Sequence, residues 1–301
     1  MVDLKIKLPD SFFQEEERDG CVVSAELKKL WAVQLDLLCE FDRVCRKHGL
    51  KYVLDFGTLL GAVRHKGYIP WDDDLDVSML REDYDRLMEI GPKEFKEPYF
   101  LQSQTTDKYY DDYVTKLRRS DTCYMTDNSK SSGDKYNQGI FIDIFVFDNV
   151  ASVDKDDLQQ MSKDSTEAYY HMYVMSHTPK LEADGIKWPV KMLRYLYFKL
   201  RYGSVRKEYL RLERYAKSCG PTGNVGTVMY AYPHCRPLSV YDEIIEIPYE
   251  NMMMPVPGGY DEVLRLRYGD YMTPVRGGSW HTMATFDTDR SYKDIVKEMK
   301  K

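Results

Sequence analysis

Features that define several protein classes are missing from this chain of 301 residues. No run of residues approaches the roughly 18 apolar positions that a membrane span needs. The N-terminal segment lacks the basic and then apolar order of a signal peptide, so we expect a cytoplasmic protein. The six cysteines form no C-x-x-C pair, which argues against a zinc ribbon or a dithiol redox site. Lys and Arg number 43 against 49 Asp and Glu, and this net charge of −6 disfavours a nucleic-acid partner.

The composition, with 43% hydrophobic and 31% charged residues, is that of a folded globular chain with a sizeable core. Apolar periodicity predicts a long helix between a Ser24 cap and a Gly49 stop. Further helices are predicted over 81–90, 154–176, 188–218 and 260–268. Strands are predicted over 52–55, 74–80, 98–103, 113–119, 122–126 and 140–148. Residues 1–20 and most of the chain after Pro221 are expected to be irregular.

The strongest chemical signal is the segment Asp72-Asp73-Asp74-Leu75-Asp76-Val77. On a strand, Asp74 and Asp76 point to one face, which Asp72 joins if the strand extends backward, whereas Asp73 points away. Carboxylates this close repel each other and raise each other's pKa. A divalent cation removes that repulsion, and oxygen ligands suit Mg²⁺ or Mn²⁺.

A third acid, Asp143, stands in the strand Phe141-Ile142-Asp143-Ile144-Phe145, which is otherwise apolar. A lone buried carboxylate is costly, so Asp143 should meet a cation or a hydrogen-bond donor. On an adjacent strand it can share a metal ion with Asp74 and Asp76. The alternatives are that the acids form a solvated loop or cap a helix, or bind calcium, although the EF-hand spacing is missing.

Gly57 and Thr58 stand at a predicted strand-to-helix turn upstream of the acids. A Gly and a small hydroxyl at such a turn let backbone N–H groups and the hydroxyl approach a phosphate. A Gly-Ser/Thr turn, a paired-acid strand and a third acid on a later strand, in this order, are the signature of nucleotidyltransferases.

Fixed cations are the second requirement of a phosphate site. The candidates are Lys116 and Arg118, which share a strand face, then Arg64, and finally His281 on a C-terminal loop. Each can equally be an ordinary surface or structural residue. Tyr268 and Tyr271 are expected to be packing residues.

The segment FGTLLGAVRHKGYIPWDDDLDV resembles the hallmark of the LicD family, whose members include phosphocholine transferases and the fukutin-related proteins. The resemblance continues in KLRRSDT, GIFIDIFVFDNV and PVPGGYDEVLRLRYGDYMTP. It implies an α+β fold with a nucleotidyltransferase-like mixed sheet, flanking helices and a helical insertion. The implied division is a catalytic core over 1–150, a helical region over 151–220, and a C-terminal segment over 221–301 that packs back on the core.

The resemblance also implies the activity: a phospho-alcohol, phosphocholine first, moves from a CDP-linked donor such as CDP-choline to a glycan or lipid-linked glycan, releasing CMP. Asp74, Asp76 and Asp143 would then be the catalytic and metal-binding acids. Two alternatives stay open. One is a nucleotidyltransferase that forms an NMP-linked product, and the other is a glycan-binding protein without catalysis on the same fold.

The stretch from Lys187 to Lys217 carries ten Lys and Arg against two Glu, interspersed with aromatic and aliphatic residues. Such a helix can lie on an anionic membrane surface, which would make the protein peripheral at the inner face of the membrane. It can instead line a groove for an anionic glycan, or cover the core with a solvated basic face.

Overall fold

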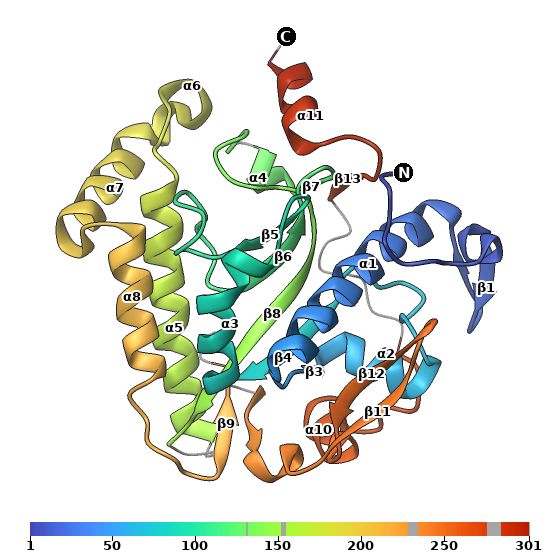
Figure 1. The fold of residues 1–301 in the computed structure, drawn as a ribbon. Coiled ribbons are helices and arrows are strands. Elements are labelled where there is room, and N and C mark those ends of the chain that lie inside the picture. Colours follow the sequence, from blue (N-terminus) through green and yellow to red (C-terminus); the bar gives the residue numbers. More distant parts are fainter. Residues whose placement is uncertain (131, 152–154, 228–233, 276–283, 301) are drawn as a thin grey trace. The chain divides into compact units, whose positions relative to one another are not determined.

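The computed structural model describes residues 1–130, 132–151, 155–227, 234–275 and 284–300 (Figure 1). By internal contacts the chain divides into two units, each described separately below. The first comprises Met1–Gln102, Val114–Val146 and Ser239–Lys301, and the second comprises Ser103–Tyr113 and Phe147–Leu238. The predicted α+β class with a mixed sheet is confirmed. Among the described helices, none has both the length and the apolar character that crossing a bilayer requires.

The first unit contains most of the sheet. Its helices are α1 (Ala25–His48), α2 (Phe56–His65), α3 (Arg81–Glu94), α4 (Asp127–Lys130), α10 (Tyr260–Tyr268) and α11 (Tyr292–Met299). Its strands are β1 (Glu16–Arg18), β2 (Cys21–Val23), β3 (Val53–Leu54), β4 (Asp76–Leu80), β5 (Tyr99–Gln102), β6 (Thr115–Arg119), β7 (Cys123–Met125), most of β8 (Ile140–Asn149), β11 (Ile244–Tyr249), β12 (Met252–Pro257) and β13 (Thr285–Asp287).

The order of the sheet brings the predicted acid strands together. β4 lies between β3 and β8, and β8 pairs antiparallel with β6, which pairs antiparallel with β5. The backbone N–H of Asp143 in β8 donates to the carbonyl of Leu75, just before β4, at 2.9 Å. The register between β6 and β8 places Lys116 directly opposite Asp143.

Helix α1 has the predicted boundaries. The Ser24 side chain accepts a hydrogen bond from the N–H of Leu27, and Gly49 takes the left-handed conformation with φ of 63°. The helix packs against β6 and α3, and Leu30, Leu37 and Phe41 are fully buried. The capping residues and the spacing of the apolar residues indicate the same helix boundaries, so the sequence alone was sufficient to locate this helix.

Helix α3 was predicted to end before Gly91 and Pro92, and this is wrong, because the helix continues to Glu94. A Cβ atom on Gly91 would lie 2.5 Å from the Leu101 side chain of β5, so this glycine serves close packing rather than a helix stop. Pro92 lies in the last turn, where its missing N–H removes one helical hydrogen bond, that to the carbonyl of Met88, and leaves the preceding turns intact.

The chain after Pro221 is more regular than predicted. β11 and β12 form an antiparallel hairpin in which Ile245 faces Val256, and β13 pairs with β7. At the other end of the chain, β1 and β2 form a short hairpin within the segment that was expected to be irregular. The predicted helix over 260–268 is confirmed as α10.

The second unit is mainly helical. Its elements are α5 (Lys155–Ser176), α6 (Leu181–Asp184), α7 (Trp188–Tyr202), α8 (Val205–Ala216), β9 (Asn224–Gly226) and β10 (Arg236–Pro237). The end of β8 pairs antiparallel with β9, which pairs with β10. The single helix predicted over 188–218 is broken at Gly203, whose φ is 84°, and Ser204 caps the new helix α8.

One buried carboxylate joins four segments of the first unit. Asp36 of α1 accepts hydrogen bonds from the backbone N–H groups of Lys5 and Ile6, from the hydroxyl of Tyr99 at 2.6 Å, and from the guanidinium of Arg119. The Asp36 side chain is fully buried and that of Arg119 is 4% exposed. Asp36 therefore fixes α1 to β5, to β6 and to the N-terminal arm.

We predict that Asp36→Ala lowers the free energy of unfolding by about 3–5 kcal/mol, because it removes one of the two carboxylates that pair with the buried Arg119 guanidinium and leaves the buried Tyr99 hydroxyl without its acceptor. Urea titration followed by circular dichroism measures this. The control is Asp127→Ala, which removes an exposed pair with Lys130 and should cost at most about 1 kcal/mol. Equal losses in the two variants would show that Asp36 does not join these segments.

Candidate active site

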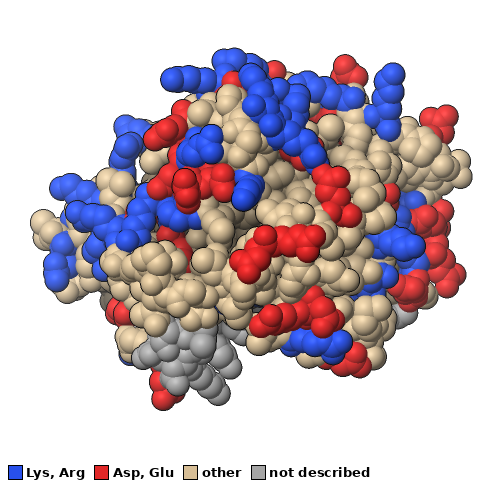
Figure 2. Space-filling model, turned by 60° about the horizontal axis from the view of Figure 1, so that its bottom comes forward, with Lys and Arg blue, Asp and Glu red and all other residues tan. Residues whose placement is uncertain are grey.

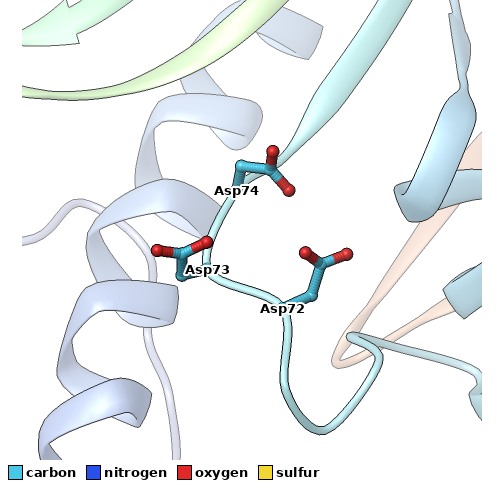
Figure 3. A group of neighbouring side chains, drawn as sticks. All are labelled: Asp72, Asp73 and Asp74. Carbon is cyan, nitrogen blue, oxygen red and sulfur yellow. The ribbon is translucent and has the colours of Figure 1, made fainter. Parts of the chain in front are cut away.

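Three consecutive carboxylates gather on the loop between α2 and β4. Asp72, Asp73 and Asp74 each place one oxygen within 4.8 Å of the others (Figure 3). The carboxylates of Asp72 and Asp74 lie on the same side of the loop, and that of Asp73 lies on the side of α1. The strand β4 begins only at Asp76, so the predicted strand over 74–80 is two residues too long at its start. The acids therefore meet through a turn of the loop, which also brings Asp73 into the group.

The loop is held by its main chain. The indole N–H of Trp31 donates to the carbonyl of Asp72 at 2.9 Å, and the side-chain amide of Gln34 donates to the carbonyl of Asp73 at 2.8 Å. Both donors stand on α1, one turn apart, on the same face. The ring of Tyr68 stacks on the face of the Trp31 indole at 4.5 Å between centroids, which fixes the orientation of the indole. α1 is therefore the support of the acidic loop.

The turn into α2 is built around the same acids. The Asp55 carboxylate accepts from the N–H of Phe56 at 2.7 Å, and Phe56 takes a left-handed φ of 49°. A Cβ atom on Gly57 would lie 2.8 Å from Oδ2 of Asp72, so any other residue there would displace that carboxylate. The hydroxyl of Thr58 accepts from the N–H of Asp76 at 2.8 Å. Gly57 and Thr58 thus lie beside the acids, in the first turn of α2.

Charge repulsion and burial act together on these groups. Burial, followed by the neighbouring carboxylates of Asp74, Asp143 and Asp72, raises the pKa of Asp76 well above its ordinary value. Burial and then Asp74 raise the pKa of Asp72 in the same way. The site is therefore a buried concentration of negative charge that a cation would stabilise.

Asp143 meets the predicted cation or donor within the protein. The ammonium of Lys116, directly opposite on β6, forms an ion pair with Oδ1 of Asp143, and both side chains are nearly buried. The same ammonium lies 3.9 Å from the centroid of the Phe141 ring. Lys116 therefore brings a positive charge to the edge of the acidic group.

The other predicted cations have partners of different kinds. The Arg118 guanidinium donates to the Gln102 side chain and, at 2.6 Å, to the carbonyl of Gly139. The Arg64 guanidinium donates to the carbonyl of Tyr271 at 2.8 Å, and burial lowers its pKa. His281, the fourth predicted residue, lies outside the described residues.

Several residues at the site escaped the sequence analysis. Asp55 is buried, and its charge adds to those that raise the pKa of Asp76. The hydroxyl of Tyr124 donates to Oδ2 of Asp73 at 3.0 Å. A tyrosine in the sequence gives no signal for such a position, whereas Asp55 ends the strand predicted over 52–55, directly before the hallmark segment, and could have been noticed.

The donor set fits a hard divalent cation. All the candidate ligands are carboxylate oxygens, which are preferred by Mg²⁺ and Mn²⁺ over softer metals. Asp72, Asp73 and Asp74 could offer one oxygen each. The raised pKa of the neighbouring Asp76 is the mark of a site where added positive charge lowers the free energy.

Comparison with known proteins agrees with this geometry. Residues 49–178 match the family model described as the nucleotidyltransferase domain of LicD, FKTN and FKRP. The chain is 35% identical over 129 residues to the lipopolysaccharide cholinephosphotransferase LicD of Haemophilus influenzae, which is 43% of this chain and 47% of that protein. Over 57 residues it is 46% identical to an uncharacterised protein of Rickettsia prowazekii and 44% identical to one of Rickettsia typhi.

The matched stretch is only part of each relative. This chain covers about half of the Haemophilus protein, at 47%, and about a fifth of the rickettsial proteins, at 21% and 18%. The family match nevertheless includes every carboxylate described above, from Asp55 to Asp143, together with Lys116. Residues 49–178 of this chain therefore resemble the nucleotidyltransferase domain of the LicD family.

Proposed function

We propose that this protein is a phosphotransferase that moves phosphocholine, or a related phospho-alcohol, from a CDP-linked donor to a hydroxyl of a cell-surface glycan. The observation that carries the proposal is the acidic group of Asp72, Asp73 and Asp74, with Asp76 and Asp143 beside it, inside the stretch that matches the LicD-family model. The name of the Haemophilus relative supplies the choline phosphate and the lipopolysaccharide acceptor.

The proposed reaction is a displacement at phosphorus. The acceptor hydroxyl oxygen forms a new bond to the phosphorus that carries choline, and the bond from this phosphorus to the bridging oxygen breaks. CMP leaves with that oxygen, and the hydroxyl proton passes to a carboxylate of the site and then to water. A bound Mg²⁺ or Mn²⁺ would neutralise phosphate charge during this step.

The chain's own residues have distinct parts in the proposal. Asp72, Asp73 and Asp74 would hold the divalent cation, with Asp76 adjoining them. Asp143 accepts the acceptor proton or completes the metal site, and Lys116 offers its ammonium to the donor's phosphate. Gly57 and Thr58 sit at the start of α2, where a helix N-terminus favours phosphate.

The donor and the place of action are part of the same proposal. CDP-choline is the expected donor, and a glycan or lipid-linked glycan is the expected acceptor. We place the reaction in the cytoplasm, where nucleotide-activated donors are made. Arg64 and Arg118 remain predicted phosphate ligands, although both have protein partners as well.

Asp74→Asn should lower the rate of CMP release from CDP-choline by about 10²–10⁴-fold, because a charged ligand is lost where phosphate charge must be balanced. The fold should persist, since the loop is held by carbonyls and the substitution relieves repulsion. Asp127→Asn, at an exposed position on α4, is the matched control and should retain full activity. An active Asp74→Asn enzyme would contradict the assignment of this residue.

Removal of divalent cations should abolish CMP release. Treatment with EDTA followed by gel filtration tests this, and Mg²⁺ or Mn²⁺ should restore the rate, whereas Ca²⁺ should restore less because it prefers more ligands at longer distances. Titration of Mn²⁺ by electron paramagnetic resonance gives a second readout that needs no turnover. Full activity in EDTA would exclude the proposed metal site.

In a competition between equal amounts of CDP-choline and CDP-ethanolamine, we expect phosphocholine to predominate on the acceptor, as measured by mass spectrometry. Choline has no N–H donor, so it needs aromatic faces, and a desolvated cation–π contact contributes on the order of 2 kcal/mol. Predominant transfer of ethanolamine phosphate would refute the choline assignment and leave phosphotransfer intact. Release of pyrophosphate from a nucleoside triphosphate would instead favour a nucleotidyltransferase.

A further inference from the structure

Helix α7 of the second unit packs with its aromatic side inward. Phe198 meets the ring of His171 on α5 at 4.8 Å between centroids, and Tyr202 stacks on the same ring at 4.0 Å. The guanidinium of Arg194 donates to the hydroxyl of Tyr170 at 2.7 Å. These contacts attach α7 to α5, yet no residue of α7 is fully buried.

The opposite side of α7 is aliphatic and exposed. The exposed fractions are 72% for Val190, 71% for Leu193 and 88% for Leu200, and 96% for Ile186 in the 3₁₀ turn (Gly185–Lys187) that leads into the helix. Their spacing of three, four and seven residues places them on one helical face, which we call the outer aliphatic face. Leu196 and Tyr197 adjoin it and are also exposed. Single exposed aliphatic residues are ordinary, whereas a continuous stripe indicates a surface that contacts something apolar.

Positive charge predominates around this face, although Asp184, directly before it, forms an ion pair with Lys191. Between Gly185 and Lys207 the chain has seven Lys and Arg and no Asp or Glu. Lys187, just before α7, and Arg194 and Arg201 within it recur every seven residues and are exposed, so they follow one border of the outer aliphatic face; we call them the basic edge. Arg194 keeps this exposure although one of its guanidinium nitrogens donates to Tyr170. Figure 2 shows Lys and Arg gathered at its left margin, the side on which α7 lies in Figure 1.

We infer that α7 binds the surface of an anionic lipid bilayer. The outer aliphatic face enters the boundary between headgroups and acyl chains, and the basic edge reaches the lipid phosphates. A helix of 15 residues is about 22 Å long and lies in the plane of the interface, which needs no membrane-spanning segment. Long Lys and Arg stems can follow the apolar surface while their charges stay among the headgroups.

The neighbouring helix shows the ordinary arrangement and so limits the inference to α7. In α8 the apolar residues Tyr209 and Leu212 are buried, and the basic residues face outward. Residues 205–217, which the sequence analysis included in the basic stretch, therefore lack an exposed aliphatic face like that of α7. A second copy of the chain is a poorer partner for α7 than lipid, because two basic edges would meet with like charge.

The test is sedimentation of the full chain with vesicles of phosphatidylcholine alone and with vesicles that also contain phosphatidylglycerol. We expect recovery with the anionic vesicles and partial release by salt. Replacing the basic edge by Gln at all three positions should weaken binding on the order of 100-fold. Leu193→Ser with Leu200→Ser should weaken it by a similar factor, since both side chains enter the bilayer boundary.

The matched control replaces Lys293, Lys297 and Lys300 of the exposed C-terminal segment by Gln, which removes the same charge and should leave binding unchanged. Circular dichroism verifies that each variant is folded. Equal sedimentation with neutral and anionic vesicles, or normal binding by both α7 variants, would overturn the inference. The inference would also be overturned if analytical ultracentrifugation showed a dimer that the double Leu→Ser variant dissociates. Binding to dextran sulfate that is lost only in the basic-edge variant would overturn it as well. None of these measurements requires catalysis, so they stand apart from the proposed phosphotransfer.

Discussion

The constraint on which the first unit depends is the concentration of negative charge at one loop. Carboxylates from Asp55 to Asp76 crowd together with Asp143, and burial sharpens their repulsion. Contacts with the surrounding structure keep the carboxylates in place despite this repulsion. The register of β6 and β8 places Lys116 opposite Asp143, and side chains of α1 donate hydrogen bonds to the carbonyls of the loop. Holding these carboxylates together lowers the free energy of unfolding. Groups that are kept at such a cost are concentrated at functional sites, which supports a functional role for this one.

Much of this centre could be predicted from the sequence because its signals are local. Four aspartates within five residues, followed by apolar residues, predicted β4 and a group of carboxylates at its start, although the sequence placed Asp74 on the strand and not on the loop before it. Asp143 stands out because a charge inside a run of apolar residues needs a partner. Helix α1 was placed correctly because its cap, its period and its glycine stop all agree. The alternation argument was wrong for the acids before Asp76: they lie on a loop, and Asp73, which was predicted to point away, places an oxygen within 4.8 Å of those of Asp72 and Asp74.

What could not be predicted depends on contacts between distant parts of the chain. Trp31 and Gln34 look like ordinary positions of an amphipathic helix, and their bonds to residues about forty positions away follow only from the packing of α1. Lys116 and Asp143 were both singled out, but their pairing requires the register of β6 and β8. The hairpin of β11 and β12 contains Pro248, Pro255 and Pro257, which weaken any strand signal although a two-stranded hairpin tolerates them.

The loop of Asp72 and Asp73 is positioned through main-chain oxygens, and every residue has one whatever its side chain. The path of the loop therefore does not depend on the charge of its side chains. A mutation can replace one carboxylate at a time while the main chain keeps its course. During evolution, the metal ligands of such a loop can change, and with them the bound ion or substrate, without any variant along the way losing the fold. Gly57 differs in this respect, because any side chain there would displace the Asp72 carboxylate, so a substitution at this position changes the arrangement of the acids themselves.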